Sequence, residues 1–82
     1  MNLASPTVTP HIAAIVLGFL REPGGYPPSG GAAPIIDAAF KLDPQHQAQH
    51  AKAWPGIVAA VDLYRSDGGL VRLRAIASGE DQ

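Results

Sequence analysis

Ten residues in the first half of the chain, 22–31, constrain the fold more than any other segment. They read Glu-Pro-Gly-Gly-Tyr-Pro-Pro-Ser-Gly-Gly and hold four glycines and three prolines. Proline has no N–H donor and glycine is costly to order, so neither a helix interior nor a central strand accepts this mixture. The segment therefore predicts a loop between a short apolar helix and a longer helical remainder.

The segment before this loop is predicted to be a helix that begins at Thr9-Pro10. Threonine caps the first amides, and the proline ring already has a helical φ. One face then carries apolar residues at helical spacing: Ile12, Ile15, Val16, Phe19 and Leu20. The opposite side is almost equally apolar, with Ala13, Ala14, Leu17 and Gly18. A helix without a polar face is expected at the centre of a core or against a partner.

Three further helices are predicted after the loop, over residues 34–42, 45–53 and 55–65. Pro34, Asp43-Pro44 and Pro55 are their start signals. The second of the three is polar, and Ala48 and Ala51 are its expected inward contacts. Proline disfavours a helical residue before it, so Trp54 is expected to end this helix. A single helix kinked at Pro55 is the competing interpretation.

Residues 70–77 fit two patterns. Leu70, Leu73, Ile76 and Ala77 have helical spacing, whereas Val71, Leu73 and Ala75 alternate with arginines as in a strand. A lone strand would have no partner elsewhere in the chain, so we favour a helix. The fold class is therefore all-α: a compact bundle of four to five short helices with one Pro/Gly-rich loop. Residues 9–77 form the domain, and 1–8 and 78–82 are expected to be flexible tails.

The composition narrows the classes of function. The chain has 82 residues, a net charge of -1 and no cysteine, so disulfides and thiolate metal sites are excluded. The apolar stretch 12–20 is too short to span a bilayer, and no basic start of a secretory signal precedes it. We expect a cytoplasmic protein. No catalytic or nucleotide-binding motif is present, and Asp37 and Asp62 are lone carboxylates, so we expect no enzyme and no cofactor.

His46 and His50 are the one pair with metal-ligand spacing. Their i, i+4 separation directs both rings to the same side of a helix. A third ligand would have to come from Asp43, His11 or another chain. Glutamines surround both histidines, so we prefer a solvated polar face and expect no metal.

The candidate partner-binding residues lie in two regions and at one helix junction. Tyr26, Pro27 and Pro28 offer an aromatic ring beside extended prolines, although a Tyr26 folded back over the domain is the preferred interpretation. Trp54 is an anchor candidate if it is exposed. The arginines of the C-terminal part are candidates for contact with an acidic partner or with phosphates: Arg65, Arg72 and Arg74.

A helix-turn-helix regulator of DNA is the alternative function. The joints 42–44 and 66–69 are short enough for such a motif. However, the chain has only six Lys and Arg residues against seven Asp and Glu. Because phosphate neutralisation supplies most non-specific affinity, nucleic acid is the less favoured partner.

Three phrases resemble small uncharacterised proteins of actinobacterial phages and prophages. They are Pro-Gly-Gly-Tyr-Pro-Pro at 23–28, Ala-Ala-Phe at 38–40 with Asp43-Pro44, and the run 54–61. The resemblance covers about residues 9–76. It implies an accessory phage protein that binds a host or virion protein inside a bacterium, and it implies no catalytic residue. Together with the apolar first helix, it makes a protein–protein interaction module, able to self-associate, our preferred hypothesis.

Overall fold

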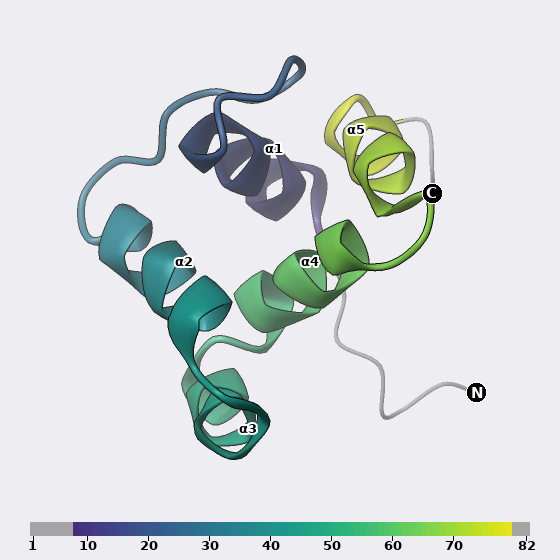
Figure 1. Ribbon diagram of the computed structural model, residues 1–82. Helices are drawn as coiled ribbons and strands as arrows, with labels where there is room; N and C mark the ends of the chain where they lie inside the picture. The colour runs from purple at the N-terminus through teal and green to yellow at the C-terminus, as the bar shows by residue number, and fades with distance from the viewer. Residues whose placement is uncertain (1–7, 80–82) are drawn as a thin grey trace.

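The computed structural model describes residues 8–79, and every regular element in this range is a helix (Figure 1). The helices are α1 (Pro10–Phe19), α2 (Ala32–Lys41), α3 (Pro44–Ala53), α4 (Pro55–Arg65) and α5 (Gly69–Ala77). The predicted all-α bundle is confirmed, and residues 70–77 are helical. The expected tails at 1–7 and 80–82 lie outside the described residues.

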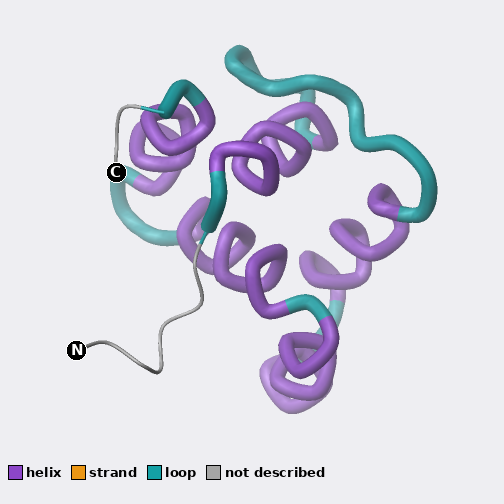
Figure 2. Tube along the Cα trace, turned by 180° about the vertical axis from the view of Figure 1, so that it is seen from behind, coloured by secondary structure: helices purple, strands orange, loops and turns teal. Residues whose placement is uncertain are grey.

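Helix α4 lies at the centre and contacts each of the other four helices. Seen from opposite sides, α1, α2, α3 and α5 surround it, and the long loop 20–31 arches over α1 to reach α2 (Figures 1 and 2). The core between them is wholly apolar. Its side chains come mainly from α1 and α4, with α2 and α5 adding the rest: Ala13, Ile15, Val16, Leu17, Ile36, Ala39, Ile57, Val58, Ala60, Val61, Leu73 and Ile76.

Helix α1 is buried on almost every side, as its missing polar face predicted. Residues 13–17 are five consecutive buried positions, which no single-sided amphipathic helix provides. The predicted cap is present, because the backbone N–H of Ile12 donates to Oγ1 of Thr9 at 3.1 Å. Val8, which we assigned to the tail, packs against the core. Val8 is therefore part of the packed domain.

Helix α2 begins at Ala32, two residues before the predicted start at Pro34. Gly31 is its N-cap, so Pro34 is the third helical residue. The first amides of a helix have no intrahelical acceptor, and a proline in the first turn therefore costs no hydrogen bond. Pro34 therefore correctly indicated the first turn of α2, but the prediction that it is the first residue of that helix was wrong.

Helix α3 has no buried residue, and the expected inward contact of Ala48 is wrong because Ala48 is exposed. Ala51 is half-buried against the core, as expected, and polar side chains also hold this helix. Nε2 of Gln47 donates to the carbonyl of Ala39 and to Oδ1 of Asp62, each at 3.2 Å. Nε2 of His50 donates to the carbonyl of Ile35 at 3.0 Å. These bonds join α3 to α2 and α4.

Trp54 separates α3 from α4, so the kinked single helix is wrong. Its φ of -132° and ψ of 60° are not helical, as the proline that follows it requires. The backbone N–H of Trp54 still donates to His50 (3.0 Å), and its carbonyl accepts from Val58 (3.1 Å). One residue thus closes α3 and opens α4 in a new direction (Figure 1).

Candidate protein-binding surface

The Pro/Gly-rich loop lies on α1, and Tyr26 folds back as preferred from the sequence. The backbone N–H of Tyr26 donates to the carbonyl of Ala14 at 3.2 Å. The Tyr26 hydroxyl shares a hydrogen bond with Nδ1 of His11 at 2.6 Å. The ring remains 47% exposed. Tyr26 therefore holds the loop against α1, and part of its side chain remains in solvent. Pro27, which follows it, is exposed, and Pro28 is half-buried.

Trp54 is 43% exposed at the junction of α3 and α4. Trp54 is therefore exposed, which is the condition under which the sequence makes it a candidate anchor for a partner. Figures 1 and 2 show α3 and α5 on different sides of α4. The structure therefore does not bring Trp54 together with the arginines of α5.

The three arginines occupy different environments. The guanidinium of Arg65 donates to the carbonyl of Phe40 and lies over the Phe40 ring, 5.3 Å from its centroid. This contact ties α4 to α2, so Arg65 has a structural role. Arg72 and Arg74 are exposed on α5, where a separation of two residues directs them about 200° apart. Arg74 lies beside the loop at Gly24.

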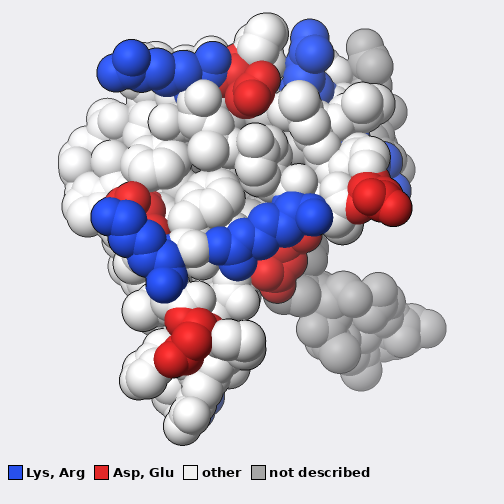
Figure 3. Space-filling model, viewed as in Figure 1, with Lys and Arg blue, Asp and Glu red and all other residues white. Residues whose placement is uncertain are grey.

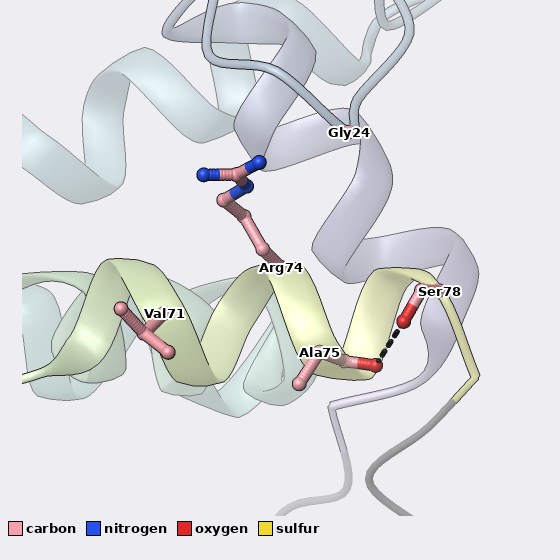
Figure 4. Close-up of a pocket in the computed structure, with 5 residues that line it drawn as sticks. All are labelled: Gly24, Val71, Arg74, Ala75 and Ser78. Carbon is pink, nitrogen blue, oxygen red and sulfur yellow. Dashed lines mark hydrogen bonds between the residues drawn. The ribbon is translucent and has the colours of Figure 1, made fainter.

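An open hollow of about 370 Å³ lies where α5 meets this loop. Its lining comes from the loop at Gly24, from one side of α5 at Val71, Arg74 and Ala75, and from Ser78, the C-cap of α5. Figure 4 shows Arg74 rising from α5 toward the loop, while Val71 and Ala75 lie along the helix. A Cβ added to Gly24 would lie 3.8 Å from Cγ of Arg74, so the loop backbone borders the stem of that side chain.

Val71 is the surface residue that sequence reasoning missed. Its side chain is 71% exposed, whereas Leu73 and Ile76 on the same helix are buried. The signal was present, since Val71 lies off the helical stripe of Leu70, Leu73 and Ile76. We used it only as evidence for a strand. On a helix, the same residue places an aliphatic side chain in solvent beside the hollow.

The two polar side chains that line the hollow differ in whether they have a hydrogen-bond or ion-pair partner within the described residues. The Ser78 hydroxyl donates to the carbonyl of Ala75 at 2.8 Å (Figure 4). Among residues 8–79, the Arg74 guanidinium has no hydrogen-bond, ion-pair or aromatic partner. Within residues 8–79, the lining contains no carboxylate, imidazole or thiol. The described lining can therefore offer apolar contact and one cation.

The histidines of α3 are engaged elsewhere. His50 bonds to Ile35, and Nδ1 of His46 lies 2.8 Å from Oδ1 of Asp43. The backbone N–H of His46 donates to the same Asp43 oxygen at 2.8 Å. This backbone bond, then the side-chain bond, lowers the pKa of Asp43. Within the described part of the chain, no three His, Asp or Glu side chains are grouped to hold a metal ion.

Charged side chains on the face shown in Figure 3 are scattered, with basic groups lying between acidic ones. One ion pair is formed within α2, where Nζ of Lys41 lies 3.0 Å from Oδ2 of Asp37. A phosphate backbone attracts a continuous basic surface. The face in view provides none.

Comparisons with protein-family models, curated proteins and solved structures gave no match. Across residues 8–79, no helix is both long and apolar enough to cross a membrane.

Proposed function

We propose that this chain is a small protein-binding domain and that its binding surface is the outer side of α5 with the adjoining hollow. The exposure of Val71 carries the proposal. A valine side chain gains about 1.5–3 kcal/mol when it is fully removed from water. Neither the loop nor a neighbouring helix covers this one. The rest of the large aliphatic side chains are buried or half-buried in the described residues, so Val71 is the exception.

The rigidity of the surroundings supports the same surface. The hollow is bordered by a helix on one side and by a loop fastened to α1 on the other. A binding surface that is already formed loses little conformational entropy when a partner docks. The resemblance to phage proteins makes a host or virion protein inside a bacterium the partner to seek.

The DNA-binding alternative has less support. Arg65, one of the three arginines on which it relied, is held against Phe40. Arg72 and Arg74 point to different sides of α5, so the three do not form one basic stripe. A mobility shift assay at low salt, where phosphate attraction is strongest, tests this alternative directly.

Affinity capture from bacterial lysate followed by mass spectrometry tests the protein-binding proposal. The bait is the full chain as wild type, as Val71→Ser and as Trp54→Ala. We expect the wild type to recover one dominant protein, and Val71→Ser to lose it while keeping the wild-type circular dichroism spectrum. Trp54→Ala is the matched control, since it removes another exposed apolar side chain from a different surface, and it should retain the partner.

Two results would contradict the proposal. One is a wild-type chain that recovers nothing and sediments as a monomer. The other is a partner that Val71→Ser retains and Trp54→Ala loses, which would move the binding surface to the α3–α4 junction. If the wild type is a dimer and Val71→Ser dissociates it, the proposed binding surface is correct and the partner is a second copy of this chain.

A further inference from the structure

We propose that the hollow recognises an acidic peptide segment, in which a carboxylate pairs with Arg74 and a neighbouring aliphatic side chain covers Val71 and Ala75. This inference rests on the proposed function and names the chemistry of the partner. It depends on two neighbouring groups of α5 that have no partner of their own within residues 8–79: one cation and one aliphatic surface.

The cation is positioned for this role. The stem of Arg74 lies beside the backbone of Gly24, and its guanidinium projects toward the loop (Figure 4). A guanidinium also matches the planar geometry of a carboxylate and donates two parallel hydrogen bonds to it.

The aliphatic surface sets the spacing of the partner. Val71 and Arg74 are three residues apart on α5, which places their Cβ atoms about 5–6 Å from each other. Ala75 follows Val71 by one turn and extends the same apolar strip. The partner must therefore present its carboxylate within one helical turn of a Leu, Ile, Val or Phe side chain. An amphipathic helix or a short extended peptide meets this requirement.

A second copy of this chain is a poor match for the same surface. Helix α5 reads Gly-Leu-Val-Arg-Leu-Arg-Ala-Ile-Ala and contains two arginines and no acidic residue. A two-fold interface places the same patch on both subunits. Two copies joined through the hollow would bring their Arg74 side chains to one patch, and the described lining of that patch holds no carboxylate to pair with them. Charge complementarity therefore favours a different, acidic protein.

A displayed library of random 12-residue peptides, panned on the full chain, tests the inference. We expect the selected peptides to be enriched in Asp or Glu within four positions of an aliphatic or aromatic residue. One selected peptide is then synthesised with its acid and with the matching amide. Both forms are titrated against wild type, Arg74→Gln and Lys52→Gln. Lys52 is the matched control because it is an exposed cation on α3.

We expect the effect of the peptide's acidic group on affinity to depend on Arg74 and not on Lys52. Replacing the acid by its amide should weaken binding to wild type and to Lys52→Gln by about two- to fivefold, the range of a solvent-exposed ion pair. Binding to Arg74→Gln should be unaffected by the same replacement. Arg74 is exposed, so its loss should leave the fold intact, and circular dichroism checks this.

Several outcomes would overturn the inference. They are the absence of selected peptides, selected peptides without acidic residues, and an acid-to-amide effect that persists in Arg74→Gln. A dimer dissociated by Val71→Ser would show that the occupant is a second copy, and a DNA mobility shift lost in Arg74→Gln would show that it is nucleic acid. If lysate capture stays dependent on Val71 in any of the first three cases, the proposed function stands and only the acidic partner is rejected.

Discussion

The backbone carbonyl of Tyr26 lies directly against Gly18 on α1. A Cβ placed on Gly18 would be 1.8 Å from that oxygen, and a Cβ on Gly25 would be 2.3 Å from the backbone nitrogen of Gly18. The loop therefore crosses α1 backbone to backbone, which only glycine permits on both sides. This crossing fixes the course of the loop past Gly24 and so forms one border of the hollow.

Gly18→Ala is expected to destabilise the chain by about 1–3 kcal/mol, the usual cost of overpacking. The sign of the change in unfolding free energy distinguishes the two cases, because a Gly→Ala change at an open helical site would stabilise the chain by about 1 kcal/mol through helix propensity. Urea denaturation measures the difference. Gly31→Ala is the control for an added methyl without a clash, since no atom lies within 4 Å of its added Cβ; as the N-cap of α2, Gly31 should lose only the smaller preference for glycine over alanine at that position. A gain in stability for Gly18→Ala would show that the loop does not cross here.

Arg21→Gly is expected to stabilise the chain by about 1 kcal/mol. Arg21 has a φ of +60°, and a left-handed conformation costs an L-residue about 1–2 kcal/mol. It closes α1 in a Schellman motif, in which Arg21 N–H donates to Gly18 and Glu22 N–H donates to Leu17. Arg21→Ala separates conformation from charge, because it keeps the strain. Equal midpoints of thermal unfolding for Arg21→Gly and wild type would contradict this account.

Local signals predicted much of the fold. Thr9-Pro10 and Asp43-Pro44 marked the starts of α1 and α3, and their side-chain caps are present. These signals act within one helical turn, so they need no tertiary information. Ala48 was wrong for the opposite reason: which side of α3 faces inward depends on the carbonyls of α2 that Gln47 and His50 reach. The sequence of α3 alone does not indicate where these carbonyl groups lie.

The candidate surface was predictable only in part. Arg74 was among the sequence candidates, but Val71 and Gly24 were not. The hollow exists because a loop residue more than forty positions away in the sequence meets α5. The bond between Tyr26 and His11 likewise joins residues fifteen positions apart. Periodicity indicates which side of a helix is apolar, and it does not indicate which loop lies beside it.

Asp43→Asn is expected to make the start of α3 less sensitive to acid. The folded-state pKa of Asp43 is lowered from the ordinary value of 3.8, chiefly by the backbone N–H of His46. The carboxylate therefore contributes stability above pH 3.8 that is lost as the pH falls through the lowered pKa. The stability difference between wild type and Asp43→Asn should be full at about pH 5 and should shrink toward pH 2.5, as urea denaturation measures. A carboxyl titration midpoint at or above the ordinary value would contradict it.

Hydrogen exchange of the complex with its captured partner tests the central claim most directly, because it locates the contact on the bound chain. The account predicts that amides of α5 and of the loop around Gly24 exchange more slowly in the complex, while those of α3 and around Trp54 do not change. Slower exchange at the α3–α4 junction with α5 unchanged would contradict it.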